Sequence, residues 1–403
     1  MIFVLILLSI EAKSQWVEMN NGLTSEIAKT VWCFGVSGNK IFAGTDGGFF
    51  VSTDFGATWI KRSDGLSDTS IRGMAIIEDK IFIVTYYGKI FLSTDEGNNW
   101  TLKNKGIEGP IVLSCITNSG NNIYVGGLGV TDGDNEGIFL STDFGESWTK
   151  KINGLSEFSI YSIAALGNYL FASTAYFVYI STDNGDFWRR VDKSKGLPYS
   201  TILSLHVSGD YVFGGGAGSG VFVSTDFGET WQEKNEGIPY PSRTVVCFAS
   251  KGNNIFAGTT KGVYFSSNKG ESWVLKDSGM VEKRTKALAI FGDYVFVGTY
   301  TGGIYRAKLE DIELSKLDDD LTPKGNLKIF PNPATDFLRI EREDYEQANL
   351  IVTNQIGEIV AKVTLEEGEQ IKIIPFSHQP AGMYFIKIIN KKGDLRYCQF
   401  VKF

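Results

Sequence analysis

Tyrosine and arginine side chains that could recognise a ligand fall in or beside short turn-like segments of this sequence. A tyrosine ring can stack on a sugar or anchor a peptide, because it offers a large apolar face and a hydroxyl. An arginine can hold a carboxylate or sulfate. The alternative is that these rings only pack over neighbouring loops. The candidate ligand-binding residues are Tyr86, Tyr87, Tyr176, Tyr199, Tyr240, Tyr300, Arg72 and Arg243.

An acidic segment supplies a second candidate chemistry. Asp132, Asp134 and Glu136 alternate just before Gly137, as oxygen ligands do at the start of a calcium loop. The rest of that loop pattern is absent, since a strand-like run follows at once. A solvated acidic loop is therefore the alternative. We expect no cofactor other than this candidate Ca²⁺.

Catalytic constellations are not apparent. The sequence has only two histidines, His206 and His378, and they fall in different predicted domains. No Ser-His-Asp arrangement, zinc motif or Cys/His cluster can be assembled from them. We therefore assign no catalytic residue.

One phrase, which reads STDFGATW at residues 52–59, recurs six times at a spacing of roughly forty residues, as a copied supersecondary unit does. Its aspartate can accept hydrogen bonds from backbone N–H groups two or three residues on, and its glycine supplies a conformation that a Cβ penalises. Its tryptophan can fill the space between units. The repeated positions, which we expect to be structural, are Asp54, Asp95, Asp143, Asp183, Asp226 and Asn268.

Each repeat contains four short β-rich segments, which are 30–36, 40–45, 49–53 and 59–62 in the first. Four antiparallel strands in such a unit form a propeller blade. A seventh unit without the phrase runs from 286 to 305, so the sequence predicts seven blades. The segment at Trp16 resembles the one after Trp59. We expect it to complete the seventh blade and close the ring, unless 312–314 fills that place.

The loops between second and third strands, and those between blades, should share one face, with the repeated turns on the other. The candidate tyrosines fall on the first face. Five cations also enter the inner strands of blades one, two, six and seven: Lys29, Arg72, Arg243, Arg284 and Lys286. We expect a half-ring of positive potential suited to a carboxylate or sulfated ligand. Scattered solubilising charge is the alternative.

The repeated phrase resembles the Asp-box (BNR) repeat, and the resemblance covers residues 15–309. In that family, which includes sialidases, the box is a fold element away from the active centre. The resemblance implies a β-propeller and leaves a sialidase-like or other glycoside hydrolase as the alternative function. Sialidases use three arginines and an Arg-Ile-Pro motif, and no Arg-Ile-Pro occurs in this sequence.

Cysteine and glycine patterns are interpreted as structural. Cys33, Cys115 and Cys247 align at one inner-strand position, which predicts buried thiols in blades too far apart for disulfides. The segment 214–220 (GGGAGSG) lacks the Lys-Ser/Thr of a phosphate loop, so we expect an inter-strand loop. In the other blades, the cysteine position aligns with Met74, Ile163, Leu205 and Leu288.

The C-terminal part has its own pattern. Residues 310–326 are charged and are expected to form a linker. Residues 327–403 contain about seven short strands, typical of a small Ig-like β-sandwich. The FPNPATD segment at 330–336, the PAGMY segment at 380–384 and the final FVK resemble the type A sorting domain of the type IX secretion system. That resemblance implies the type IX secretion machinery as a partner.

The N-terminal residues 1–14 are expected to be a signal peptide. Residues 2–10 are almost wholly apolar but too short to span a bilayer, and small residues flank Lys13. No transmembrane segment is expected in the mature chain. A net charge of −7 argues against a nucleic-acid partner. We therefore expect an all-β, secreted or outer-membrane cell-surface protein: a seven-bladed propeller that acts as a non-catalytic binding or scaffold module for a glycan or protein.

Overall fold

The computed structural model describes residues 15–109, 111–129, 136–312, 328–330, 336–341, 347–354, 359–369, 371–390 and 395–402. The predicted signal peptide lies outside these residues. The chain forms two compact units, Met1–Ile312 and Glu313–Phe403, which are described separately below. No helix within the described ranges is long and apolar enough to cross a membrane.

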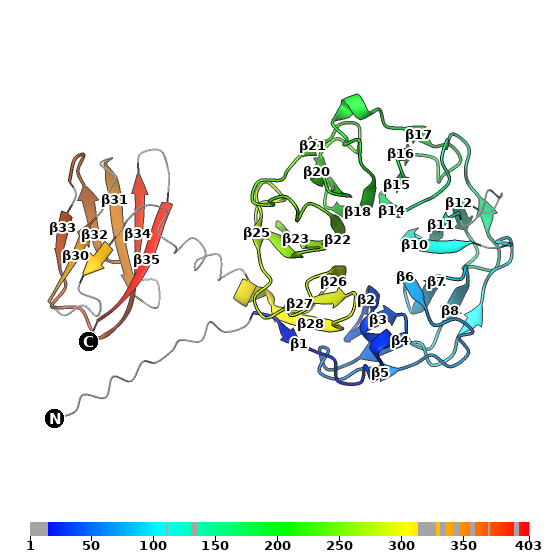
Figure 1. Ribbon diagram of the computed structural model, residues 1–403, viewed down its shortest axis with the longest axis horizontal. Coiled ribbons are helices and arrows are strands. Elements are labelled where there is room, and N and C mark those ends of the chain that lie inside the picture. The colour runs from blue at the N-terminus through cyan, green and yellow to red at the C-terminus, as the bar shows by residue number, and fades with distance from the viewer. Residues whose placement is uncertain are drawn as a thin grey trace. The chain divides into compact units, whose positions relative to one another are not determined.

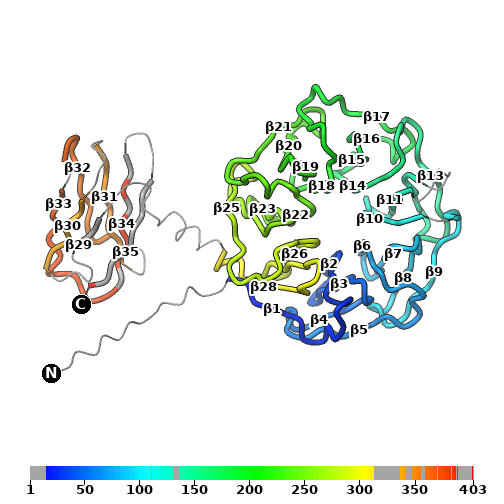
Figure 2. The backbone as a smooth tube through the Cα atoms, viewed as in Figure 1, coloured from blue at the N-terminus to red at the C-terminus, as the bar shows by residue number. Residues whose placement is uncertain are grey.

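The first unit is a ring of seven four-stranded antiparallel sheets (Figures 1 and 2), which confirms the predicted seven-bladed propeller. Blades one to three are β2–β5 (Val31–Ser37, Lys40–Thr45, Gly48–Ser52, Ile60–Lys61), β6–β9 (Ile71–Ile77, Lys80–Thr85, Ile90–Ser93, Thr101–Leu102) and β10–β13 (Val112–Ser119, Asn122–Leu128, Gly137–Ser141, Thr149–Lys150). Blades four and five are β14–β17 (Ser162–Leu166, Tyr169–Ser173, Val178–Ser181, Arg189–Arg190) and β18–β21 (Ile202–Ser208, Tyr211–Gly216, Gly220–Ser224, Gln232–Glu233). Blade six is β22–β25 (Val245–Lys251, Asn254–Thr259, Gly262–Ser266, Val274–Leu275), and blade seven is β26–β28 (Thr285–Phe291, Tyr294–Thr299, Ile304–Lys308) with β1 (Val17–Glu18).

Burial follows the position of each strand in its blade. The first strand of each blade lies nearest the central axis and contacts the first strands of both neighbouring blades. The second strand, KIFAGT in blade one, is buried along almost its whole length. Such continuous apolar runs are expected where a sheet is covered on both faces, as each blade is by its neighbours. The two-residue outer strands are largely exposed.

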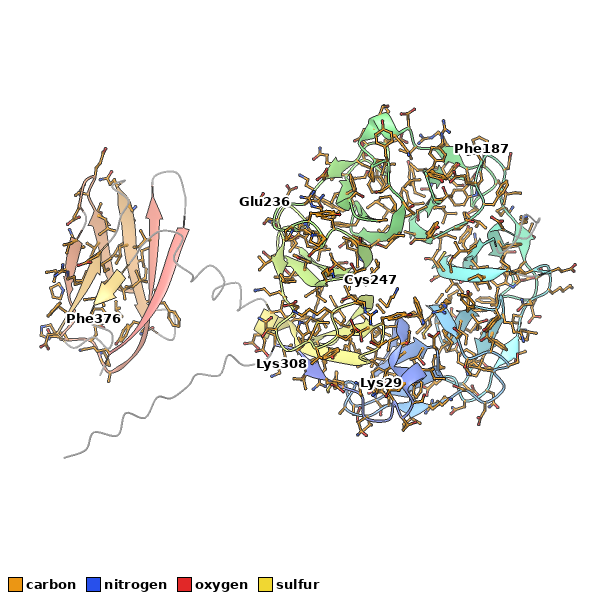
Figure 3. All side chains as sticks on the ribbon, in the orientation of Figure 1. Lys29, Phe187, Glu236, Cys247, Lys308 and Phe376 are labelled. Carbon is orange, nitrogen blue, oxygen red and sulfur yellow. The ribbon has the colours of Figure 1, made fainter. Side chains whose placement is uncertain are left out.

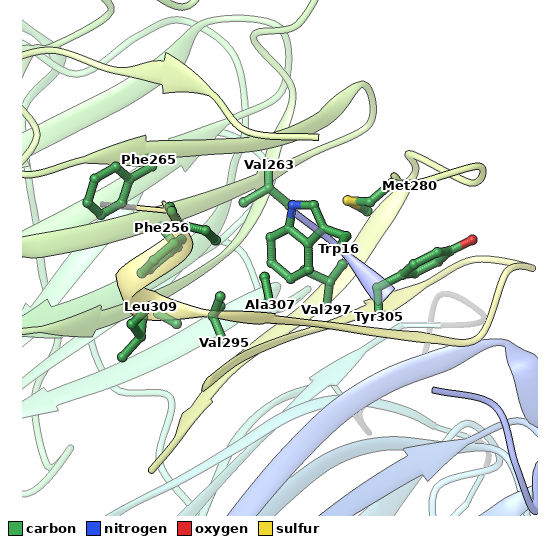
Figure 4. Packing of buried hydrophobic residues seen from close by; sticks show 12 residues of the cluster. Trp16, Phe256, Val263, Phe265, Met280, Val295, Val297, Tyr305, Ala307 and Leu309 are labelled. Carbon is green, nitrogen blue, oxygen red and sulfur yellow. The ribbon is translucent and has the colours of Figure 1, made fainter. Parts of the chain in front are cut away.

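The ring closes through its N-terminal strand, as predicted. In β1, Val17 pairs with Arg306 of β28. Trp16 is 1% exposed, and its indole N–H donates to the carbonyl of Lys276 in blade six at 2.9 Å. Figure 4 shows Trp16 packed among apolar side chains of blades six and seven. Ile312 is buried in the same cluster, so the packing of the propeller extends past residue 309.

The repeated turn is held by two polar side chains. Asp54 Oδ1 accepts from the N–H of Thr58 at 2.9 Å, and Oδ2 accepts from its hydroxyl at 2.6 Å. That N–H lies four residues on, so the prediction of two or three was wrong. The Ser52 hydroxyl accepts from the N–H of Gly56 at 2.8 Å and donates to Asp54 at 2.8 Å. Phe55 and Gly56 both adopt the left-handed region, at φ 54° and 82°, which turns the chain back on the serine.

The tryptophans of the phrase, together with Trp16 at the equivalent place in blade seven, link consecutive blades. In six blades the indole N–H donates to the carbonyl of the residue that follows the outer strand of the preceding blade. Trp231 is the exception, because its indole bonds to Gly228 in its own turn. The short helix η2 (Lys193–Lys195) follows the outer strand of the preceding blade at this point. The six bonded residues are Trp16, Trp59, Trp100, Trp148, Trp188 and Trp273.

The inner-strand alignment predicted for the cysteines was off by one residue in four blades. Cys33, Cys115 and Cys247 pair with Gly44, Gly126 and Gly258 of their second strands. Their true equivalents are small residues, because the position packs tightly against the next blade: a Cβ on Gly73 would lie 3.1 Å from the Cγ2 atom of Ile116 in blade three. The residues predicted there, Met74, Ile163, Leu205 and Leu288, lie one place further on than Gly73, Ser162, Ser204 and Ala287.

The three cysteines are free thiols in half-buried residues. Burial raises the pKa of the Cys33 thiol to about 12, so it is protonated at neutral pH. Figure 3 shows Cys247 on the inner side of its blade, whereas Phe187 lies at the periphery.

The glycine-rich segment is mostly strand, not loop. Gly214 to Gly216 end β19 and Gly220 opens β20, which leaves only residues 217–219 as the turn. A Cβ on Gly215 would lie 2.6 Å from the carbonyl oxygen of Val245 in the next blade. The glycines therefore allow two blades to approach closely. The glycine pattern in the sequence does not by itself distinguish this role from that of a loop.

The second unit is a two-sheet sandwich. One sheet has the order β29-β30-β33 and the other β32-β31-β34-β35, with a shared apolar core that includes Leu338, Leu350 and Ile386. The Tyr384 hydroxyl donates to the carbonyl of Pro380 at 2.7 Å, which ties the predicted PAGMY segment together. The strands are Lys328–Phe330, Phe337–Glu341, Ala348–Asn354, Ile359–Leu365, Ile371–Pro375, Gly382–Asn390 and Leu395–Lys402.

Candidate functional site

A β-bulge recurs near the start of the inner strands. In blade one, Val31 pairs with Thr45 and Cys33 with Gly44, so Trp32 is left without a partner. The same register shift occurs in five other blades. A bulge re-aims the extra side chain, and bulges are common beside functional sites. The bulged residues are Trp32, Arg72, Ser114, Leu203, Val246 and Lys286, and Tyr161 takes the equivalent place just before β14.

Three bulged side chains from consecutive blades meet at Trp32. The Arg72 guanidinium carbon lies 3.7 Å from the centre of the indole, and the Lys286 Nζ lies 4.7 Å from it. Tyr86 and Tyr300, from the turns between second and third strands, extend the group: Arg72 lies 4.8 Å from the Tyr86 ring and Lys286 lies 5.4 Å from the Tyr300 ring. We call these five residues the Trp32 cluster.

Asp46 is a carboxylate that contacts the Trp32 cluster. Its Oδ1 accepts from the Trp32 indole N–H at 3.0 Å and from the Ser70 hydroxyl at 2.6 Å. Arg72 Nη2 approaches the same oxygen only to 3.4 Å, and Arg72 Nη1 is buried with no hydrogen-bond partner among the described residues. A buried donor left unpaired costs roughly 1–3 kcal/mol. Arg72 is therefore held by aromatic rings more than by hydrogen bonds.

Lys286 has no carboxylate partner among the residues that the structure describes. Burial lowers the pKa of its amine, and the positive charges of Arg72 and Arg284 act in the same direction. Positive charge is thus concentrated between blades seven and two.

The other cations of the predicted half-ring are neutralised locally. Arg284 makes a two-pronged contact with Glu282, which receives a further hydrogen bond from Thr301. Arg243 Nη1 lies 3.5 Å from Glu233, and Lys29 lies 2.9 Å from Glu26. The sequence pattern predicts that these cations lie near the candidate ligand-binding face. It does not reveal the carboxylates that pair with them.

A second aromatic and basic group lies on blade four and the loop that follows it. Arg190 and Lys193 lie 4.6 Å and 5.5 Å from the ring of Phe177, and Lys193 lies 5.0 Å from the ring of Tyr199. Tyr199 is 86% exposed and Tyr176 is 61% exposed. Most of the Tyr199 surface is therefore open to a ligand, with Lys193 beside its ring.

The eight predicted ligand-binding residues are not all brought together. Arg72, Tyr86 and Tyr300 join the Trp32 cluster, and Tyr87 packs edge-on against Tyr86 at 5.2 Å. Tyr240 is 81% exposed in the loop between blades five and six, the loop that also holds Arg243. Sequence reasoning missed Trp32 and Asp46. An alignment of the first inner-strand residues that allowed for the bulge could have revealed Trp32.

The predicted calcium loop is only partly visible. Asp132 and Asp134 lie outside the described residues, while Glu136 accepts from the Ser159 hydroxyl at 3.1 Å. Within the described ranges, no group of three or more His, Cys, Asp or Glu residues could hold a metal ion.

His206 is a core residue. Its Nε2 lies 2.9 Å from the Ser250 hydroxyl, and burial lowers the pKa of its imidazole to about 4. It is therefore neutral at physiological pH.

Comparison with known families agrees with this architecture. Residues 328–399 match the secretion system C-terminal sorting domain, and residues 222–233 match the BNR/Asp-box repeat. The chain is a BNR/Asp-box propeller with a secretion sorting domain. This domain implies the type IX secretion machinery as a partner and a secreted or cell-surface protein. No curated protein matches the sequence.

Solved structures resemble the propeller in fold. YCF48 from Cyanidioschyzon merolae is 16% identical, with a TM-score of 0.56, over 74% of this chain and 99% of that one. A structure of YCF48 bound to a D1 peptide is 14% identical, with a TM-score of 0.55, over 73% and 95%. The extracellular domain of a hybrid two-component system from B. thetaiotaomicron is 14% identical, with a TM-score of 0.61, over 96% and 57%. At these identities the likeness shows the fold alone.

Proposed function

We propose that the propeller is a non-catalytic binding or scaffold module that meets a glycan or protein ligand outside the cell. The observation that carries this proposal is the gathering of cations and aromatic rings around Trp32, on the face opposite the Asp-box turns. Aromatic and arginine side chains contribute most of the binding energy at many interfaces.

Two further observations support a ligand on this face. Tyr199 and Tyr240 are large, exposed and located on inter-blade loops, where loops can vary without disturbing the blades. A propeller of the same fold, YCF48, has been solved with a bound peptide. A protein or peptide ligand is therefore the first class to test.

A glycoside hydrolase needs a carboxylic acid that is protonated near neutral pH. Glu282 is the carboxylate beside Tyr300, and its hydrogen bonds to Arg284 lower its pKa to about 2. It is ionised at neutral pH and cannot serve as the general acid. Glu282 is therefore a binding residue of this face and not its general acid.

The test is binding of the purified protein to peptide and glycan arrays, with and without calcium. We expect a ligand whose binding falls when Tyr199 and Tyr240 are both replaced by alanine. Replacing Phe187 and Phe227, exposed aromatic residues of Asp-box turns on the opposite face, is the matched control. Absence of any ligand, or turnover of a glycan, would refute the proposal. A calcium-dependent melting temperature would support the predicted site at Asp132, Asp134 and Glu136.

A further inference from the structure

The aromatic rings of the Trp32 cluster are already covered by cations of the protein. Arg72 and Lys286 both lie within 5 Å of the centre of the Trp32 indole. Arg72 also covers Tyr86 at 4.8 Å, and Arg284 covers Tyr300 at 4.7 Å. A sugar ring stacks on a free aromatic face, whereas these faces carry cations of the protein itself. The cluster is therefore poorly suited to carbohydrate stacking.

The cluster has more positive groups and hydrogen-bond donors than acceptors to pair with them. Arg72 makes one long contact, at 3.4 Å, with Asp46, and its Nη1 has no acceptor in the part of the chain that the structure describes. Lys286 lacks a carboxylate partner within the described part of the chain. Asp46 already receives hydrogen bonds from Trp32 and Ser70. Nearby Asp68 is occupied by the backbone N–H groups of Ser70 and Tyr87.

We propose that Arg72 and Lys286 receive a carboxylate of an acidic peptide segment, which supplies the missing acceptors beside Trp32. This inference rests on the proposed binding function and names the ligand class for that face. Arg72 offers a delocalised positive charge with several N–H donors, and Lys286 adds a point charge from the blade on the other side of Trp32. Covered aromatic faces favour a peptide over an acidic glycan.

The experiment measures binding of an oligoglutamate peptide to the purified protein by fluorescence anisotropy at low salt. Oligoglutamine of the same length and oligogalacturonate are the comparison probes. Arg72→Gln and Lys286→Met are the test variants. Arg62→Gln is the matched control, because it removes the same charge beside Glu96 of an Asp-box turn, on the other face. Thermal melts establish that each variant is folded, and Lys286→Met serves if Arg72→Gln is not.

We expect oligoglutamate to bind at least about tenfold more tightly than oligoglutamine. Each test variant should weaken the binding of oligoglutamate about tenfold, as expected for the loss of a hydrogen bond to a charged group. Arg62→Gln should leave binding unchanged. Equal binding of the two peptides, an equal loss in Arg62→Gln, or preference for oligogalacturonate would overturn the inference. An array ligand that binds both test variants normally would refute the inference alone. The absence of any array ligand would refute the proposed function.

Discussion

The two faces of the propeller are built from the same blades, but one face repeats its side chains and the other varies them. On the Asp-box face, one pattern of hydrogen bonds recurs in six blades: a buried serine hydroxyl accepts from a glycine N–H, and an Asp or Asn oxygen accepts from an N–H four residues on. On the other face, the bulge recurs but its side chain differs from blade to blade.

This difference separates fold from function within one repeat. A position that must satisfy the same backbone groups in every blade keeps the same residue type. A bulged position is not constrained in this way, so its residue type can vary: it is Trp32 in one blade and Ser114 in another. Residues that break the repeat, on a backbone that keeps it, are therefore the place to look for a ligand.

The largest effect on stability is expected for Trp16, which lies where the ring closes. Trp16→Ala should lower the free energy of unfolding by about 3–5 kcal/mol, because it empties a buried site at the closure of the ring. Urea denaturation followed by tryptophan fluorescence and circular dichroism measures the change. Val17→Ala, at an exposed neighbouring position, is the control and should cost far less. Equal costs for the two variants would contradict the role of Trp16 in closure.

A smaller loss is expected from the Asp-box face. Ser141→Ala leaves the N–H of Gly145 without its acceptor and should cost about 1–3 kcal/mol, with ligand binding intact. Ser147→Ala removes an exposed hydroxyl from the same turn and should cost about 0.5 kcal/mol or less. Chemical denaturation of both variants tests the ranking. A loss of binding in folded Ser141→Ala would break the division between the faces.

On the opposite face, the effect should appear in binding more than in stability. Asp46→Asn removes the carboxylate that competes for Arg72, while an amide oxygen can still accept from Trp32 and Ser70. We expect affinity for oligoglutamate to rise about threefold and stability to fall by less than about 1 kcal/mol. Titration of the variant and the parent side by side decides this. Weaker binding would show that Asp46 positions Arg72 instead of competing for it.

The smallest effect is expected for the dependence of stability on acidic pH. Hydrogen bonds from the Ser147 hydroxyl and N–H lower the pKa of Asp143 from 3.8 to about 2. Its ionised form therefore stabilises the folded state above pH 3.8, and this contribution is lost as the pH falls towards 2. Asp143→Asn should make unfolding less dependent on pH in that window, as urea titrations can measure. The natural Asn268 shows that an amide fits this turn. An unchanged pH profile would contradict the assignment.

The sequence predicted the periodic parts of the molecule well. Seven blades, the closing role of Trp16 and the positions of the Asp-box turns all follow from one recurring phrase. The site was harder, because it depends on a one-residue register shift. A bulge leaves the apolar pattern of the strand almost intact, so Met74 was aligned with Cys33 when Gly73 is its equivalent. Ion pairs such as Arg284 with Glu282 also depend on side-chain geometry that spacing does not reveal.

The closing strand also sets the order of events in folding. Trp16 bonds to a residue 260 positions away, and Asn20 receives the N–H of Ile304 from 284 positions away. The first strand to leave the ribosome must therefore wait for the last strand of the ring before it can pair. Contacts between such distant segments form slowly, since a long loop must close first. The ring therefore cannot close before the seventh blade is present, and its closure joins the two ends of the propeller sequence.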